Sequence, residues 1–273
     1  MMFLSRARPL LAVLGMLLLG YAHAQPVLDR VRTARALKVC IWPEYYGVTY
    51  RHPRTQELIG IDIELAAALA SDLNVRVVYV DSSFPTLVSD LVEDRCDVAM
   101  FAVGVTAQRA EKLRFTQPYL RSDIYGITTK SNQVVREWSD IDKPGVLVAV
   151  QSGTFMEPVM EQRLKHAQLV RVKLPATRER ELVAGRVDVF MTDYPYSRRL
   201  LDNADWARLI APAEPFSVLP YAYAVKPGDA QWLAVVDEFV SRILSLIHLS
   251  DPTRRYAISY AVFCFNSTFR LLY

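Results

Sequence analysis

The 273-residue sequence contains only three cysteines, ten glycines and four histidines. Three cysteines are too few for a small domain held together by disulfides, and so little glycine excludes a collagen-like chain. The histidines have no spacing typical of metal ligands, which predicts no metal site. They are His23, His52, His166 and His248. We also predict no bound cofactor.

Runs of basic residues and long apolar runs are also missing. The formal net charge is only +3, and no segment gathers Lys and Arg, so nucleic acid is not an expected partner. Between the N-terminal segment and roughly the last thirty residues, no apolar run approaches the roughly 20 residues that span a bilayer. With 52% hydrophobic and 22% charged residues, the composition is that of a globular protein of one large domain or two modest ones.

Residues 1–24 have the features of a secretory signal peptide. Arg6 and Arg8 precede an apolar run at 9–20, and Ala22-His23-Ala24 is a small-x-small cleavage site. The mature chain is therefore expected to begin near Gln25. Since no cysteine lies near the cleavage site, a lipid anchor is not expected, and we predict export to the periplasm.

Two stretches of the chain alternate between strand and helix patterns, which is typical of parallel sheets covered by helices. In the first stretch, strands are predicted at 37–42, 75–80 and 97–101, with helices at 61–73 and 87–92.

The second stretch predicts strands at 146–150 and 169–174 around a helix at 156–167. Strand-like runs at 124–130 and 221–225 are interpreted as connections between two lobes. A helix at 232–243 is expected to pack back on the first lobe. The predicted bounds are 25–125 plus 221–244 for lobe one and 126–220 for lobe two.

An internal repeat supports two similarly built lobes. Residues 91–100 (LVEDRCDVAM) match residues 182–191 (LVAGRVDVFM) at six of ten positions, and each segment is predicted to contain a helix end, a turn and a strand start. Chance similarity of two α/β junctions is the alternative.

Polar residues follow three of the predicted strands, where ligands collect in open α/β sheets. Thr106 is a candidate helix cap, and Arg109 one turn later can bind a carboxylate through two N–H groups, although a solvated arginine on a helix surface is the alternative. Gly153 and Thr154 begin a helix whose N-terminus favours anions, but Thr154 and Glu157 also fit a capping box. Asp193 can hold an ammonium group or cap the next helix.

Several segments together resemble the periplasmic solute-binding proteins, family 3, of polar amino-acid ABC transporters, over about residues 37–243. The resemblance lies in 60–65 (GIDIEL), 95–99 (RCDVA), 105–109 (VTAQR), 115–119 (FTQPY), 148–154 (VAVQSGT), 185–189 (GRVDV) and Asp193. It implies a type II periplasmic binding protein, an α/β fold of two lobes, each a doubly wound, mostly parallel sheet with flanking helices. It also implies a monomer that closes on one amino acid and delivers it to the membrane permease of an ABC importer.

The same resemblance implies the residues of the binding site. The ligand ammonium is assigned to Asp193. The ligand carboxylate is assigned to Ala102, Gly104, Thr106, Arg109, Gly153 and Thr154. This set agrees with physical chemistry, because a zwitterion that leaves water needs each of its charges paired. Since these groups come from both lobes, the ligand favours the closed state.

The side-chain pocket implied by the resemblance is aromatic and uncharged, although some of its rings can belong to the core. It consists of Trp42, Tyr45, Phe84, Phe101 and Phe155. Trp42 stands where relatives that select basic ligands carry an acid. A neutral or aromatic ligand is therefore predicted, and a basic one is not.

Two other functions stay open. The sequence also resembles cyclohexadienyl dehydratase in outline, a secreted enzyme of the same fold that acts on prephenate or arogenate. Such an enzyme needs a general acid or base in the cleft, and Glu44 and Glu157 are the available carboxylates. A sensor domain is the third reading, but it normally needs an attached membrane segment. A binding protein without enzymatic activity is the reading we prefer.

Cys40 and Cys96 lie on predicted neighbouring strands and can pair in an oxidising compartment, although strand spacing alone leaves the pairing open.

Residues 245–273 carry none of the expected ending of the last helix. Part of this tail resembles a translated sequencing adapter, so we interpret it as an aberrant, non-native end.

Overall fold

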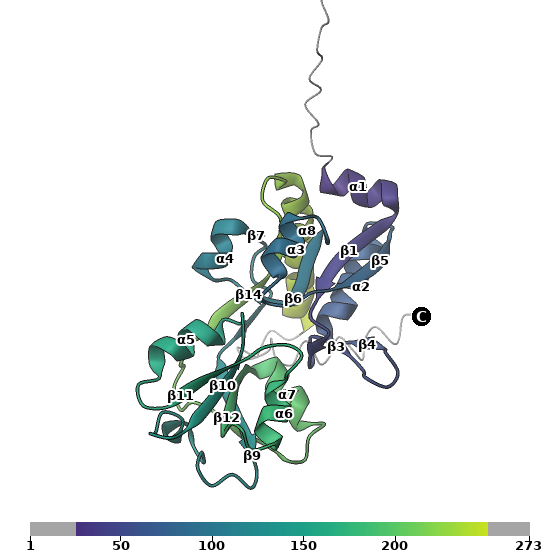
Figure 1. Ribbon diagram of the computed structural model, residues 1–273. Coiled ribbons are helices and arrows are strands. Elements are labelled where there is room, and N and C mark those ends of the chain that lie inside the picture. Colours follow the sequence, from purple (N-terminus) through teal and green to yellow (C-terminus); the bar gives the residue numbers. More distant parts are fainter. Residues whose placement is uncertain (1–25, 251–273) are drawn as a thin grey trace, which may run out of the picture.

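The computed structural model describes residues 26–250, with side chains through residue 245. The predicted signal peptide lies outside the described residues, and so does the predicted aberrant tail beyond residue 250. The described chain forms two lobes, each built on its own open sheet, with lobe one above lobe two in Figure 1. No helix among the described residues has the length and apolar character needed to cross a membrane.

The sheet of lobe one has six strands in the order β5-β1-β6-β14-β7, and β8 also pairs with β14. β1 is parallel to β5 and β6, whereas β14 is antiparallel to β6, β7 and β8. The strands are β1 (Ala36–Ile41), β5 (Arg76–Asp81), β6 (Val98–Gly104), β7 (Arg114–Phe115), β8 (Leu120–Ser122) and β14 (Leu219–Val225). The helices of this half are α1 (Val27–Ala34), α2 (Ile61–Asp72), α3 (Leu87–Val92), α4 (Ala107–Lys112) and α8 (Ala230–Ser250).

The sheet of lobe two has five strands in the order β11-β10-β12-β9-β13. β10 is parallel to β11 and β12, and β9 is antiparallel to both of its neighbours. The strands are β9 (Ile124–Thr129), β10 (Leu147–Gln151), β11 (Gln168–Val172), β12 (Val189–Asp193) and β13 (Ala207–Ile210). The helices are α5 (Met156–Arg163), α6 (Arg178–Val183), α7 (Tyr194–Leu201) and a 3-10 turn, η1 (Trp138–Asp140).

The predicted parallel alternation is confirmed in both lobes, but the two predicted connections are strands inside the sheets. β9 and β14 lie next to β12 and β6 and run antiparallel to them. Both are largely buried, which an exposed connection would not be. The chain instead crosses between the lobes at Asp123, between β8 and β9, and again at residues 211–218, between β13 and β14.

The segment that precedes α2 contains a small sheet that the sequence did not predict. It has three antiparallel strands in the order β2-β3-β4, of two or three residues each. They are β2 (Glu44–Tyr45), β3 (Thr49–Arg51) and β4 (Leu58–Ile59). Strands this short show no alternation of polar and apolar residues over a useful length.

The internal repeat corresponds to a repeated structure. Asp97 and Asp188 hold equivalent places, and each carboxylate accepts a hydrogen bond from the backbone N–H of the first parallel strand of its lobe, at Lys38 (2.7 Å) and Leu147 (2.8 Å). The turn residue three places before each aspartate has a positive φ, 60° in one lobe and 69° in the other. Real similarity of the two lobes, not chance, explains the matched sequence.

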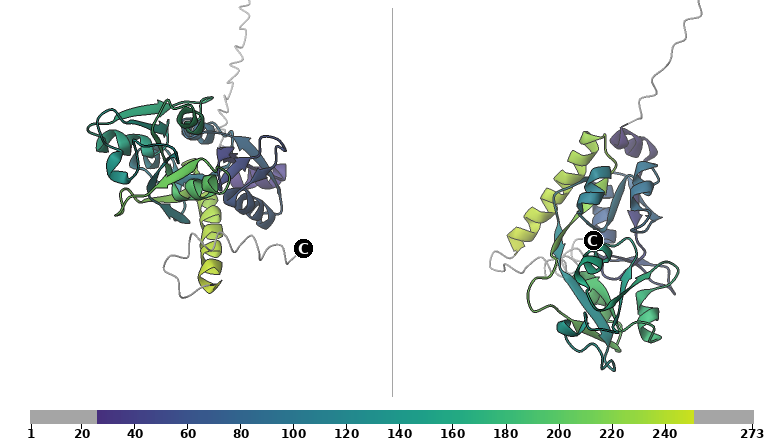
Figure 2. Two further views of the ribbon diagram at one scale, coloured as in Figure 1. Left: turned by 90° about the horizontal axis from the view of Figure 1, so that it is seen from below. Right: turned by 60° about the vertical axis from the view of Figure 1, so that its left-hand side comes forward.

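The last helix packs back on lobe one, as predicted. Trp232 of α8 is buried and its indole N–H donates to the carbonyl of Asp97 at 2.8 Å. The right-hand view of Figure 2 shows α8 along the outer side of this lobe. Cys40 of β1 and Cys96, two residues before β6, are joined by a disulfide with their Cα atoms 5.5 Å apart.

Candidate functional site

A small cavity lies between the two lobes where strands of both sheets end. Trp42 follows β1, Thr154 follows β10, Asp193 ends β12, and Ala102 lies near the end of β6. The carboxyl ends of parallel strands from two sheets therefore meet at one place, as expected for a ligand site in this class of fold. The lining consists of Trp42, Tyr45, Phe84, Ala102, Thr154, Phe155, Met156, Arg178, Thr192, Asp193 and Tyr221.

Seven of the predicted site residues line this cavity. They are Trp42, Tyr45, Phe84, Ala102, Thr154, Phe155 and Asp193.

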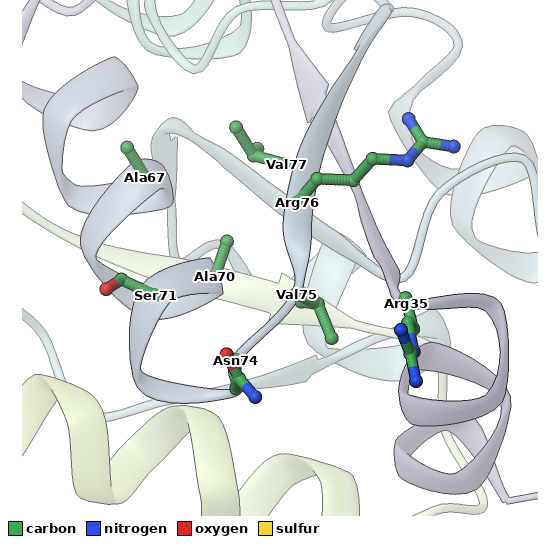
Figure 3. A pocket seen from close by; sticks show the side chains of 8 residues that line it. All are labelled: Arg35, Ala67, Ala70, Ser71, Asn74, Val75, Arg76 and Val77. Atoms are coloured by element: carbon green, nitrogen blue, oxygen red, sulfur yellow. The ribbon is translucent and has the colours of Figure 1, made fainter.

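A second hollow lies on the surface of lobe one beside α2 and the edge strand β5, and Figure 3 shows its lining side chains, among them Arg35 and Arg76. None of the predicted site residues lines this second hollow.

Arg109 lies beside the cavity and contacts both lobes. The alternative of a solvated arginine is wrong, because its side chain is only 8% exposed. Its Nη1 donates to the carbonyl of Gly104 in lobe one and its Nη2 to the carbonyl of Gly153 in lobe two, each at 2.9 Å. The guanidinium also lies 5.4 Å from the centre of the Phe84 ring. Burial lowers the pKa of Arg109 to about 10.

The sequence of α4 positions this arginine. The hydroxyl of Thr106 accepts a hydrogen bond from the backbone N–H of Arg109 at 3.3 Å, which caps the helix as predicted. Thr106 does not line the cavity. Arg109 makes no ion pair with a carboxylate in the part of the chain that the structure describes. Its charge is therefore held by two carbonyl dipoles and one ring.

Gly153 lies where the two lobes are in close contact. It has φ of 79°, and a Cβ atom added there would lie 2.8 Å from the backbone nitrogen of Pro85 in lobe one. Its amide N–H does not face the cavity, because it donates to the carboxylate of Glu157 at 2.8 Å. The prediction that this amide binds the ligand carboxylate is not supported in this conformation. The Thr154 hydroxyl donates to the carbonyl of Gln151 at 2.7 Å and lines the cavity.

Asp193 fills one of the two roles that the sequence left open, because it caps the next helix. One carboxylate oxygen accepts from the backbone N–H of Tyr196 at 3.0 Å and so caps α7. The other accepts from the hydroxyls of Tyr221, at 2.8 Å, and Tyr45. Tyr45 belongs to lobe one, so this contact also joins the lobes. Burial raises the pKa of Asp193, and these hydrogen bonds oppose that rise.

Four of the five aromatic residues assigned to the side-chain pocket line the cavity. The rings of Trp42 and Phe84 are 5.3 Å apart, and Phe155 lies 6.0 Å from Tyr221 across the cavity. Phe101 is fully buried behind Phe84, 5.1 Å away, and does not line the cavity. It belongs to the core of lobe one because it lies within β6, which is buried along its whole length.

Sequence reasoning missed Arg178, which lines the cavity and is only 3% exposed. It is the first residue of α6, directly after the capping Thr177. Its Nη1 donates to the carbonyl of Met191 at 2.6 Å, and its guanidinium lies over the rings of Phe190 and Tyr196, at 5.1 and 4.9 Å. The only sequence signal was its place after a helix cap in the same lobe as Asp193.

The two carboxylates that we considered for an enzyme do not line the cavity. Glu157 pairs with Arg171 at 2.8 Å and accepts the Gly153 amide. Glu44 is exposed on β2. Within residues 26–250, no group of three or more His, Cys, Asp or Glu side chains has a geometry that could hold a metal ion.

Comparison with known proteins identifies the fold. The model of the bacterial extracellular solute-binding proteins, family 3, matches residues 37–247. Cyclohexadienyl dehydratase of Pseudomonas aeruginosa is 29% identical over 238 residues, which cover 84% of this chain and 88% of the relative. The L-cystine-binding protein TcyJ of Escherichia coli K12 is 24% identical over 231 residues, 85% of each chain.

Two solved structures are similar over most of the chain. The ancestral amino acid-binding protein that is a precursor of cyclohexadienyl dehydratase has a TM-score of 0.72 at 26% identity, covering 80% of this chain and 93% of its own. A substrate-binding protein of an amino acid ABC transporter from Streptococcus pneumoniae, bound to L-arginine, has a TM-score of 0.73 at 21% identity, with 87% and 98% covered. The second likeness supports the fold alone.

Proposed function

The chain belongs to the bacterial extracellular solute-binding proteins, family 3, and from this premise we propose that it is a periplasmic receptor for one amino acid. It binds the amino acid between its lobes and delivers it to the permease of an ABC importer. The lobes are proposed to have the bounds expected from the sequence, 25–125 with 221–244 and 126–220. The membership of the strands supports this division to within two residues, since β9 of lobe two begins at Ile124 and β14 of lobe one at Leu219.

One observation carries the proposal: two buried groups of opposite charge lie at the same cleft, on different lobes. Arg109 belongs to lobe one and Asp193 to lobe two, and each already makes a hydrogen bond to the other lobe. In the proposed complex, the ligand carboxylate replaces the carbonyl of Gly153 as acceptor for Arg109. The ligand ammonium replaces the Tyr45 hydroxyl as donor to Asp193.

This exchange explains why the ligand should stabilise the closed form. A guanidinium gains more from a carboxylate than from a neutral carbonyl, since hydrogen bonds between two charged groups are stronger. Both partners are available to one small ligand only when the lobes are together. Differential affinity for the closed state then shifts the open–closed equilibrium.

The lining of the cavity supports a restriction on the ligand. Trp42, Phe84 and Phe155 offer apolar ring surface to its side chain. The buried cation of Arg178 opposes a basic side chain in the same cavity. The aromatic lining is compatible with the neutral or aromatic side chain predicted from the sequence. The charge of Arg178 affects whether that side chain is neutral.

The receptor proposal is tested by thermal unfolding of the mature protein with each of the twenty amino acids. A ligand at 100 times its Kd adds about 2.7 kcal/mol of stability, which is easily measured. One or a few non-basic amino acids are expected to raise the melting temperature. Stabilisation by none of the twenty, or by lysine and arginine alone, would contradict the proposal.

A dehydratase-like enzyme is the second candidate. The dehydratase relative supports it, and so does Asp193, a buried carboxyl group with a raised pKa that lines the cavity. Against it, Glu44 and Glu157 do not line the cavity, and a general acid or base must come within hydrogen-bond reach of its substrate. Incubation of the mature protein with prephenate or arogenate distinguishes the two, because product formation would favour the enzyme.

A further inference from the structure

Arg178 is the one charged residue of the cavity to which the proposed function gives no partner. It is only 3% exposed, yet it makes no ion pair among the residues that the structure describes. A guanidinium has five N–H donors, and the structure gives this one a single hydrogen bond, from Nη1 to the carbonyl of Met191.

The remaining donors of Arg178 face accessible space. Within the described residues, the fully enclosed side-chain nitrogen and oxygen atoms that lack a hydrogen-bond partner are Ser152 Oγ and Arg208 Nε. The Nε and Nη2 atoms of Arg178 are not among them, although no acceptor bonds to them. Since Arg178 lines the cavity, a ligand in the cavity can accept hydrogen bonds from these two nitrogen atoms.

The charges at the cavity do not balance. The lining contains one positive charge, Arg178, and one negative charge, Asp193, and Arg109 directly beside the cavity adds a second positive charge. Glu44 and Glu179 lie near Arg178 outside the lining, but neither bonds to it, and Glu179 accepts instead from the hydroxyl of Tyr196. A buried charge is costly unless it is paired, so the closed cavity favours a ligand of net negative charge.

We infer that the ligand is an amino acid with a second anionic group in its side chain, and that Arg178 binds this group. The inference rests on the proposed receptor function and names its substrate class. A neutral side chain would leave one buried cation unpaired in the complex, whereas an anionic side chain completes the balance. This departs from the neutral ligand predicted from the sequence.

The surroundings of Arg178 suit this role. The rings of Phe190 and Tyr196 and the carbonyl of Met191 hold the plane of the guanidinium in one orientation. A fixed guanidinium loses little conformational freedom when a carboxylate binds to it. Trp42 and Phe84, on the opposite lobe, can then contact the apolar part of the ligand side chain.

The experiment is isothermal titration calorimetry of the mature protein with matched acids and amides at pH 7. The pairs are L-glutamate with L-glutamine, L-aspartate with L-asparagine, and 4-carboxy-L-phenylalanine with 4-carbamoyl-L-phenylalanine. Each pair has nearly the same shape and differs by one charge. In at least one pair, the acid is expected to bind at least about tenfold more tightly than the amide.

Two variants assign the preference to the residue. Arg178→Met keeps the length and removes the charge, and it should abolish the preference for the acid. Arg180→Met is the matched control, because Arg180 is exposed on the same helix, and it should keep the preference. The melting curve shows whether Arg178→Met folds. If it does not, Arg178→Lys is used in its place. The wild-type comparison of acids with amides decides the charge of the ligand in either case.

The outcomes separate this inference from the function on which it rests. If amides or other neutral amino acids bind and no acid is preferred, the inference about Arg178 is overturned and the receptor remains. A preference for the acid that survives in Arg178→Met also overturns it. If none of the six compounds and none of the twenty amino acids binds, the receptor proposal fails, and this inference fails with it.

Discussion

Gly153 offers a direct test of closure, because its substitution affects the contact between the lobes. Its φ of 79° disfavours any residue with a Cβ atom, by about 1–2 kcal/mol. In addition, the new Cβ atom would lie 2.8 Å from the nitrogen and 2.9 Å from Cδ of Pro85, which belongs to the opposite lobe. The backbone strain is present in the open and closed forms alike, whereas the clash exists only in the closed form.

Gly153→Ala is therefore expected to weaken ligand binding by the cost of the clash. Overpacking of a closed contact costs about 1–3 kcal/mol, which corresponds to about 5- to 150-fold in Kd. The assay is calorimetric titration with the best amino acid of the screen, together with small-angle X-ray scattering. Ligand should reduce the radius of gyration of the wild type more than that of the variant.

Gly185→Ala is the matched control. Gly185 also has a positive φ, 69°, but an added Cβ atom would meet no heavy atom within 4 Å. This control should lose folding stability through strain alone and keep its affinity. Wild-type affinity in Gly153→Ala, or equal weakening in both variants, would refute the account of closure.

Three further predictions concern the site and the core of lobe one. Arg109→Ala should weaken binding by about 2–5 kcal/mol, the range for removing one partner of a buried charge pair, and unchanged affinity by calorimetry would remove Arg109 from the site. Burial raises the pKa of Asp62 from 3.8 to about 6, so the folded state holds this proton more tightly than the unfolded state. The contribution of Asp62 to the free energy of unfolding should therefore fall by about 3 kcal/mol as pH rises from about 3 to 7, and urea titrations of Asp62→Asn should lack this fall. The Cys40–Cys96 disulfide closes a loop with a sequence separation of 56, so its reduction should lower the free energy of unfolding by about 2–5 kcal/mol. An unchanged melting temperature in dithiothreitol would contradict this prediction.

The sequence predicted best those elements whose pattern is local. The apolar spacing from Ile61 gives α2, and Thr106 caps α4 through its own side chain. The burial of β9 and β14 depends on neighbours far along the chain, so their apolar runs could not show whether they connect the lobes or complete the sheets. The helix expected at 156–167 ends earlier, at Arg163, because Leu164 is extended.

In the candidate site too, residues with a local sequence signal were predicted, and residues positioned by distant parts of the chain were not. Arg109 and Asp193 follow strand ends and were found from that position together with the family resemblance. Tyr221 lies within an apolar strand, and nothing in that pattern indicates that its hydroxyl points to Asp193. Arg178 was missed because its burial results from the packing of α6 against β12. The amide of Gly153 was assigned to the ligand, but the side chain of Glu157 accepts its hydrogen.

The most direct test of the whole account is a crystal structure of the mature protein grown with the amino acid that stabilises it most. We expect the α-carboxylate of the ligand on the guanidinium of Arg109 and its ammonium on the carboxylate of Asp193, in one closed cavity. A ligand bound elsewhere, or bound between the lobes with either of these residues turned away from it, would contradict the account.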